Sequence, residues 1–334
     1  MATDRPDAQQ LDLERVTHNL SIGALRPIPG RVNLMKFGHS LPRAFYMYLL
    51  VLGGLLLASS PSQALTARHA RHHDAASLPV LRSGSVLVLD ADTSSVLYSR
   101  HSDQPVPIAS ISKLLTAMVV LDARQPMEEQ LEISPDDVAM GRGTASRLSV
   151  GTSLSRADLM HLALMSSENR AAHALGRNYP GGMSAFVQAM NDKARALGMS
   201  SAHFVEPTGL SSHNVASPQD LSKLVLAASQ DPTIRAFSTD PAYSVPVGRQ
   251  MVEFHNTDRL VSNPGWEIIV QKTGYIAAGG KCLVMQAVIA GRSVVMVLLD
   301  SFGKYTRLAD ASRVKKWMES AQSALSSGRL SPVT

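Results

Sequence analysis

Two groups of strand-like segments at opposite ends of the chain, separated by a helical region, constrain what this sequence can fold into. Residues 84–90 and 96–100 are rich in Val and Leu around a polar turn, which predicts a β-hairpin. The late strands are expected at residues 266–274, 281–289 and 293–300, with a tight turn at 290–292 and a closing helix over about 305–325. Strands at both ends with helices between them predict an α/β sandwich that carries an inserted helical subdomain.

The helical subdomain is expected over about 125–235. Ser155 followed by Asp158 is a capping pair, which predicts a helix that ends near 166–169, where another begins. Further helices are expected at 183–197 and 217–229, and short strand-like pieces at 131–133 and 147–150 within a Gly- and Ser-rich stretch.

The N-terminal region has the pattern of a secretory signal. Residues 45–58 form an apolar run preceded by basic residues and followed by small ones that end at Ala64. The run is shorter than the roughly 20 residues that span a membrane. We therefore expect a signal peptide at 35–64 and a periplasmic protein, with an uncleaved anchor as the alternative. The remaining segments are interpreted as a disordered extension (1–34), a linker (65–82), a folded domain (83–325) and a tail (326–334).

Composition excludes several classes of function. The net charge is only +5, and no basic run is interleaved with aromatic residues, so nucleic acid is not an expected partner. The single cysteine, Cys282, lies in an apolar stretch and is expected to be a buried structural thiol. The cluster of His69, His72 and His73 lacks metal-ligand partners and is interpreted as a solvated tail. No metal or organic cofactor is expected.

One short pattern, Ser110-x-x-Lys113, offers a nucleophile and a base. It lies in a predicted core helix that Pro107 opens, where residues three apart share a face. A serine needs a neighbouring base, and a desolvated lysine can be neutral enough to serve. The same spacing recurs at Ser301 with Lys304 and at Ser312 with Lys315, so spacing alone does not select the pair.

The order of three motifs does select it. Ser110-x-x-Lys113 is followed by Ser167-Glu168-Asn169 between two predicted helices, and then by Lys272-Thr273-Gly274 in a predicted strand. This ordered set resembles the serine penicillin-recognising enzymes. Residues 164–172, 207–210, 272–276 and 279–284 are most similar to low-molecular-mass D-alanyl-D-alanine peptidases, in the endopeptidase branch called penicillin-binding protein 7. The competing Ser212-His213-Asn214 lacks a preceding helix end.

The resemblance implies a fold and a set of roles. The fold is an antiparallel five-stranded sheet flanked by helices, with an inserted helical subdomain, as in β-lactamases and transpeptidases. Ser110 is expected to attack a D-alanyl carbonyl of a peptidoglycan peptide stem while Lys113 accepts its proton, and water then releases the acyl-enzyme. The same resemblance implies that Ser167 relays a proton to the leaving amine and that Asn169 positions the substrate and Lys113. Lys272 would supply positive charge, Thr273 would bind a substrate carboxylate, and Gly274 would let its strand approach the substrate closely. The backbone N–H groups of Ser110 and Tyr275 would bind the oxyanion.

Several alternatives stay open at this point. Peptidoglycan stems and covalently bound β-lactams are the expected partners, and the sequence indicates no oligomeric state. The short segment 326–334 leaves no room for the domain and membrane helix of larger carboxypeptidases, which favours an endopeptidase over a carboxypeptidase. A β-lactamase is disfavoured because no Glu-x-x-Leu-Asn segment follows the second motif. A β-lactam sensor or wall-binding module is the non-enzyme alternative, and Glu168 is expected to be a solvated loop carboxylate.

Overall fold

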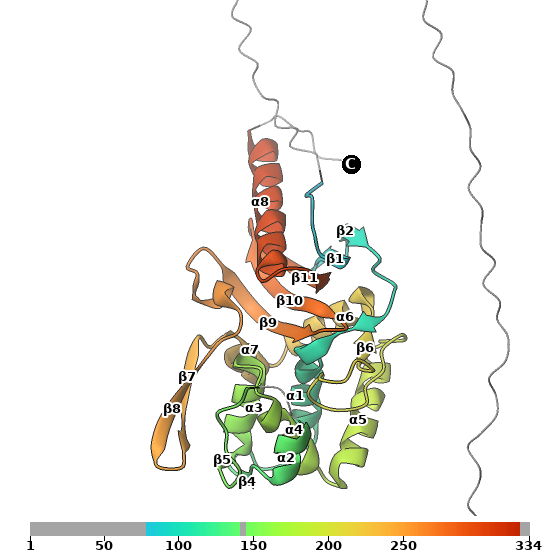
Figure 1. Cartoon of the computed structure of the whole chain (residues 1–334). Helices are drawn as coiled ribbons and strands as arrows, with labels where there is room; N and C mark the ends of the chain where they lie inside the picture. The colour runs from blue at the N-terminus through green and yellow to red at the C-terminus, as the bar shows by residue number, and fades with distance from the viewer. Residues whose placement is uncertain (1–77, 141–144, 328–334) are drawn as a thin grey trace, which may run out of the picture. The chain divides into compact units, whose positions relative to one another are not determined.

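A five-stranded antiparallel sheet forms the centre of the fold. The structure, a computed structural model, describes residues 78–140 and 145–327. The strand order is β2-β1-β11-β10-β9 (Figure 1). The strands are β1 (Ser85–Asp90), β2 (Val96–Arg100), β9 (Glu267–Ile276), β10 (Gly280–Ile289) and β11 (Arg292–Ser301). Ser85 pairs with Leu299 and Asp90 with Val294, so the first strand lies against the last. The predicted sheet is confirmed.

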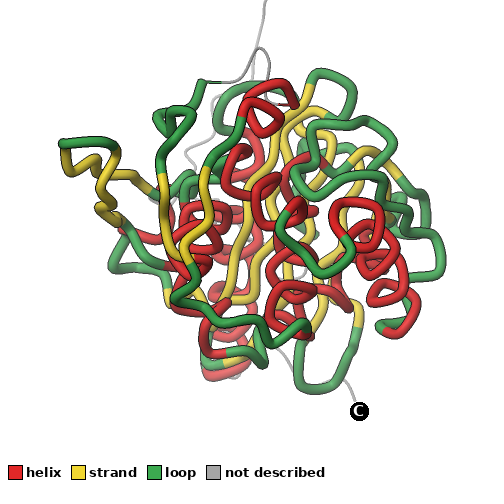
Figure 2. The backbone as a smooth tube through the Cα atoms, turned by 90° about the horizontal axis from the view of Figure 1, so that it is seen from below, coloured by secondary structure: helices red, strands yellow, loops and turns green. Residues whose placement is uncertain are grey.

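Both faces of the sheet are covered by helices, which explains why its strands are apolar without interruption. Successive side chains of a strand point to opposite faces. In β1, Val86 and Val88 pack toward the long helix α8 (Thr306–Ser326), while Leu87 and Leu89 pack into the core that contains α1 (Ser112–Asp122) and α6 (Pro218–Ala228). Figure 2 shows the strands from below, with helices on both sides of them. Burial on both faces makes the sheet a rigid base for whatever lies at its edge.

The region between β2 and β9 is mainly helical, as predicted. Its remaining elements are β3 (Val106–Pro107), η1 (Ala109–Ile111), β4 (Gln130–Glu132), α2 (Pro135–Met140), β5 (Ser153–Ser155), α3 (Arg156–Met165), α4 (Asn169–Arg177), α5 (Gly182–Ala196), β6 (Val215–Ala216), α7 (Pro232–Thr239), β7 (Ala242–Val247), β8 (Gln250–His255) and η2 (Arg259–Ser262). The Ser155 and Asp158 pair forms a reciprocal capping box on α3. The β7–β8 hairpin extends away from the helices (Figure 1).

Three local predictions differ from the structure. Residues 147–150 form no strand; the partner of β4 is β5, where Leu154 is buried opposite Leu131. The short helices α2 and α7 and the β7–β8 hairpin were not predicted, because each is too short for a clear apolar period. Leu81 and Arg82, assigned to a linker, already belong to the fold, since Leu81 is buried in the α8 face of the sheet.

The remaining predictions for the termini fall outside the described residues. These are the extension at 1–34, the signal peptide at 35–64, the three histidines of the linker and most of the tail at 326–334. Within residues 78–140 and 145–327, no helix combines the length and the apolar character that crossing a membrane requires.

The start of the fold is held to α8 by one buried carboxylate. Asp310 Oδ2 accepts hydrogen bonds from the backbone N–H of Arg82 at 2.9 Å and from both the N–H and the hydroxyl of Ser83 at 2.7 Å. Asp310 and Ser83 are fully buried. Removing this acceptor leaves buried donors without partners, which is among the more costly changes in a folded protein.

We expect Asp310→Ala to lower the free energy of unfolding by about 3 kcal/mol, because the buried N–H and hydroxyl of Ser83 and the partly buried N–H of Arg82 lose this acceptor. Urea unfolding of the purified protein measures this change. The control is Asp192→Ala on α5, where the exposed carboxylate contacts only the side chains of Gln188 and Arg195 on the helix surface among the described residues, so the change is expected to stay within about 0.5 kcal/mol. Equal effects of the two substitutions would contradict the anchoring role of Asp310.

Candidate active site

Ser110 lies in a tight turn just before α1 and not inside the helix. Pro107 pairs with Val215 in the short β3–β6 ladder, and the turn η1 then leads into α1 at Ser112. The prediction that Pro107 opens the helix is therefore wrong, because that residue belongs to a strand. Ala109 has a positive φ of 51°, a conformation that costs a non-glycine residue energy and tends to occur at functional sites.

Lys113 reaches three different segments of the chain with one amine. Its Nζ lies 2.9 Å from Ser110 Oγ, 2.7 Å from Asn169 Oδ1 and 2.6 Å from the carbonyl oxygen of Thr208. The side chain is fully buried. The first two motifs of the sequence are thus brought together at this nitrogen, along with a carbonyl that the sequence did not single out.

The surroundings of Lys113 favour its neutral form. Burial lowers the pKa of Lys113 to about 7, and the charges of Glu206 and Glu168 counter only part of that shift. The Asn169 and Thr208 oxygens can only accept hydrogen bonds, so they take the two N–H groups of a neutral amine. The remaining lone pair of the nitrogen then faces the Ser110 hydroxyl. This is the arrangement that a general base needs in order to remove the hydroxyl proton.

The Thr208 carbonyl is presented by a tightly held loop. Glu206 accepts hydrogen bonds from the backbone N–H groups of Thr208 and Gly209, at 2.6 and 2.7 Å. Gly209 has a φ of +79°, and a Cβ there would lie 1.9 Å from the carbonyl oxygen of Ala109. Only glycine allows this loop to contact the turn that carries Ser110. The Pro-Thr-Gly stretch was noted in the sequence as part of the family resemblance, but its contact with Lys113 has no local pattern.

The second motif occupies the junction between α3 and α4. Ser167 has a φ of +61° and is partly exposed, and among the described residues no hydrogen bond joins it to Lys113 or Lys272. Glu168 is buried and caps α4 by accepting from the N–H of Arg170. The expectation of a solvated Glu168 is wrong, because its carboxylate stabilises the helix that presents Asn169.

The third motif lies in β9, the edge strand nearest Ser110. Thr273 is buried, and its hydroxyl lies 2.6 Å from that of Thr257. A Cβ at Gly274 would lie 2.9 Å from the Ala109 Cβ and 3.0 Å from the Ser110 nitrogen. The glycine was expected to allow close approach to a substrate, but the close neighbour is the protein's own turn. Tyr275 follows at the exposed rim, beneath the ammonium group of Lys281.

A second buried lysine, Lys272, lies among charged groups that the sequence did not single out. Its Nζ donates to the Thr273 carbonyl at 2.9 Å. Burial lowers the pKa of Lys272 well below 10.5, the charges of Lys113 and Arg307 lower it further, and Asp258 raises it. Asp258 and Arg307 were missed because each comes from a separate segment, before β9 and in α8, with no motif around it.

The rival features have structural roles. Ser301 is buried and hydrogen-bonded to Ser83, and Ser312 bonds the Leu308 carbonyl along α8. Asn214 of the competing Ser212-His213-Asn214 donates to the Glu206 carbonyl and supports the loop. Cys282 is buried, as predicted, and burial raises the pKa of its thiol to about 12.

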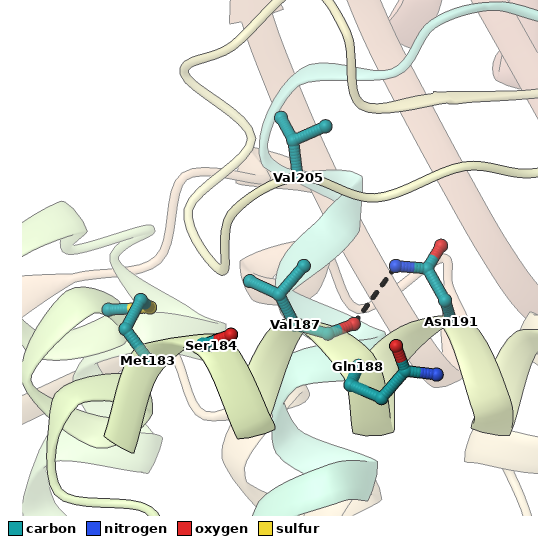
Figure 3. Close-up of a pocket in the computed structure, with 6 residues that line it drawn as sticks. All are labelled: Met183, Ser184, Val187, Gln188, Asn191 and Val205. Atoms are coloured by element: carbon teal, nitrogen blue, oxygen red, sulfur yellow. Dashed lines mark hydrogen bonds between the residues drawn. The ribbon is translucent and has the colours of Figure 1, made fainter. Parts of the chain in front are cut away.

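A surface hollow of about 460 Å³ lies elsewhere, on α5 (Figure 3). It is lined by uncharged side chains: Met183, Ser184, Val187, Gln188, Asn191 and Val205. In Figure 3 the Asn191 amide donates to the Val187 carbonyl, at 2.9 Å. None of these residues takes part in the Ser110 site, and none can act as an acid or base. Within the described residues, no group of three or more His, Cys, Asp or Glu could hold a metal ion.

Comparison with known proteins identifies the family of the chain. A family model described as D-alanyl-D-alanine carboxypeptidase matches residues 72–303. The chain belongs to this family of serine peptidases. A D-alanyl-D-alanine endopeptidase of Pseudomonas aeruginosa is 48% identical over 82% of this chain and 89% of its own length, and one of Escherichia coli is 48% identical over 74% and 80%. The crystal structure of a Streptomyces DD-transpeptidase matches with a TM-score of 0.67 and 25% identity, over 72% of this chain and 98% of its own.

The match spans the three segments that meet at Lys113, since residues 72–303 include Ser110, Asn169 and Thr208. It ends just before α8, which contributes Arg307 to the surroundings of Lys272. The peptidase therefore has both its Ser110 turn and its β9 edge strand within the region that defines the family.

We expect Gly209→Ala in this peptidase to slow acylation of Ser110 by a fluorescent penicillin about 100-fold, because the new methyl group pushes the Thr208 carbonyl away from Lys113. Gly151→Ala is the matched control: Gly151 has a φ of +83°, but the described residues place nothing within 4 Å of the added Cβ. Its cost is expected to be about 1 kcal/mol in stability, with normal acylation. A folded Gly209→Ala variant that is acylated at the wild-type rate contradicts the close-contact account.

Proposed function

We propose that this peptidase is a serine D-alanyl-D-alanine endopeptidase that cleaves D-alanyl cross-links of peptidoglycan through an acyl-enzyme on Ser110. The observation that carries the proposal is the buried Lys113 amine, 2.9 Å from Ser110 Oγ, in an environment that lowers its pKa to about 7. The names of the two relatives at 48% identity support the endopeptidase activity.

Acylation begins when the Ser110 hydroxyl passes its proton to the neutral Lys113 amine and its oxygen attacks the D-alanyl carbonyl. The carbonyl oxygen gains the negative charge and accepts hydrogen bonds from the backbone N–H groups of Ser110 and Tyr275. Gly274 supports this role, because it lets β9 lie against the Ser110 turn. Asn169 and the Thr208 carbonyl hold the new ammonium group in place.

The leaving amine then needs a proton. In the proposal, the ammonium of Lys113 returns it by way of the Ser167 hydroxyl, and the bond between the carbonyl carbon and nitrogen breaks. Water enters, gives a proton to Lys113 and attacks the ester carbonyl. The bond between the carbonyl carbon and Ser110 Oγ then breaks, Lys113 returns the proton to that oxygen, and the carboxylate product leaves. The partly exposed position of Ser167 between α3 and α4 leaves its hydroxyl available for this transfer.

The cations next to the site suit a substrate with a carboxylate beside the scissile bond. Both a terminal D-alanine and the D-centre of a cross-linking diamino acid carry one there. Lys272 and Arg307 supply positive charge, and Thr273 supplies a hydroxyl. β9 is the edge strand of the sheet, so an extended peptide stem can lie along it and use its free backbone groups. Covalent inhibition by penicillins follows from the same serine.

The proposal includes the periplasm as the place of action. The apolar run at 45–58 and the small residues that end at Ala64 support export. A D-alanyl-D-alanine carboxypeptidase is the second candidate, since the family model has that description. The two activities differ only in whether a second stem or a single D-alanine leaves.

Purified wild-type protein is expected to be labelled by a fluorescent penicillin, while Ser110→Ala is expected to lose the label entirely, because the acyl bond forms on that oxygen. Ser301→Ala is the control for the rival pair and should be labelled normally. If the wild type is not labelled, or if Ser110→Ala is labelled, the proposed chemistry is wrong.

A digest of purified muropeptides then decides the reaction. We expect cross-linked dimers to disappear and monomers to accumulate, as read by chromatography and mass spectrometry. Loss of the terminal D-alanine from pentapeptides, with dimers intact, assigns the carboxypeptidase instead. If the protein is labelled by penicillin but changes neither the dimers nor the pentapeptides, it is a β-lactam sensor.

A further inference from the structure

A buried carboxylate, Asp258, lies next to the third motif and has no part in the mechanism described so far. It is fully buried at the start of η2, where its Oδ1 accepts from the Leu260 N–H at 2.9 Å. Its Oδ2 is also buried and has no hydrogen-bond partner among the described residues. A helix cap needs only one acceptor oxygen, and a neutral side chain can provide it. The second oxygen, with its charge, is left to be explained.

The segment that carries Asp258 is hydrogen-bonded to the residues immediately before and after Lys272. Asn256 Oδ1 accepts from the Gln271 amide at 2.9 Å, and the Thr257 hydroxyl lies 2.6 Å from that of Thr273. Residues 256–258 therefore run alongside 271–273 of β9. Asp258 directly follows Thr257 in this segment, and Lys272 lies between Gln271 and Thr273, the two residues that the segment contacts.

The charged groups that act on this pair come from separate elements. The charge of Arg307 in α8 lowers the pKa of both Asp258 and Lys272, and the charge of Lys113 in α1 lowers that of Lys272. Asp258 is the only carboxylate that raises the pKa of Lys272 in the described structure; Arg307 opposes it, and so does Lys113 whenever Lys113 is protonated. A fully buried lysine near Arg307 loses its proton readily unless an anion compensates.

The geometry points to Asp258 as a positioning residue that acts as the buried counter-ion of Lys272 and keeps that lysine cationic for a substrate carboxylate. This inference rests on the proposed function, which gives Lys272 its contact with the substrate. Asp258 itself touches no reacting atom.

The pKa directions give the pair a distinct dependence on pH. Burial raises the pKa of Asp258 to about 6, although Arg307 and Lys272 oppose the shift, so Asp258 is ionised above that pH. Acylation rises as Lys113 loses its proton near pH 7 and falls again when Lys272 loses its own. Removing the Asp258 charge lowers the pKa of Lys272 further. The alkaline fall then begins at lower pH, while the rise set by Lys113 stays largely in place.

The test compares Asp258→Asn and Asp258→Ser with the wild type. Both substitutions keep an oxygen that can cap η2, but remove the charge. The rate of acylation by a fluorescent penicillin, which carries a carboxylate, is measured across pH. Asp258→Glu, which restores the charge, is the rescue variant. Asp231→Asn is the matched control, because Asp231 caps α7 with two hydrogen bonds but is not among the charges that act on Lys272.

We expect the alkaline limb of the neutral variants to move down by about one pH unit or more, the typical effect of a nearby opposite charge. On that alkaline limb their acylation should be about tenfold slower than that of the wild type, the fold-change that a shift of one pH unit produces. The difference should vanish below pH 6, where wild-type Asp258 is itself protonated. Asp258→Glu should recover most of the wild-type profile, and Asp231→Asn should retain it.

Binding of phenylboronic acid, followed by boron NMR at the same pH, separates this role from general damage to the site. The boronate bonds to a serine oxygen but carries no carboxylate, so its affinity for the neutral variants should stay within about twofold of wild type. A loss of acylation that is equal at every pH, or a parallel loss of boronate binding, overturns the counter-ion role. The role is also overturned if a folded Asp258→Asn or Asp258→Ser variant shows the same alkaline fall in acylation as the wild type.

The same experiment keeps the two proposals apart. If wild-type protein is not acylated by penicillin at any pH, the proposed function fails and the Asp258 inference falls with it. If the wild type is acylated with a rise near pH 7 and the neutral variants keep its profile, only the counter-ion role is lost.

Discussion

The rest of the site depends on one hydrogen-bonded amine, the Nζ of Lys113. It is buried, and no carboxylate of the described residues contacts it directly; its hydrogen-bond partners there are a hydroxyl, an amide oxygen and a backbone carbonyl from three separate segments. A charged amine in such a place is costly, whereas a neutral amine satisfies two acceptors and points its lone pair at the serine. The activation of Ser110 therefore follows from the burial of Lys113 and from its two acceptors, which take the two N–H groups of a neutral amine.

The fold provides this environment through close backbone contacts. The sheet is covered on both faces, so its edge strand β9 has a fixed position, and Gly274 allows it to meet the Ser110 turn. Gly209 does the same for the loop that supplies the Thr208 carbonyl. The two buried lysines differ in what their surroundings favour: Lys113 has acceptors that suit a neutral amine, while the charge of Asp258 favours the ammonium form of Lys272.

Much of this arrangement could be predicted from the sequence, for physical reasons that differ between elements. The long strands and capped helices carry strong periodic and capping signals, and the ordered motifs identified Ser110 and Asn169, two of the three groups that meet at Lys113. The 3₁₀ turn at Ala109–Ile111 could not be predicted, because a single turn has no period and Pro107 is a common helix-opening residue. Glu168 was misjudged because burial is decided by tertiary packing. Asp258, Arg307 and the Thr208 carbonyl act through contacts between distant segments, which no local spacing encodes.

The protonation state of Lys113 is the central claim, and NMR titration of lysine side chains measures it directly. Protein labelled with ¹³C-lysine is titrated from acid to alkaline pH, and the Lys113 signal is assigned by its absence in Lys113→Arg. The account predicts that this signal titrates near pH 7, about three units below an ordinary lysine. A Lys113 signal that titrates above pH 9 would show a permanently charged amine, and the role of Lys113 as the base would have to be abandoned.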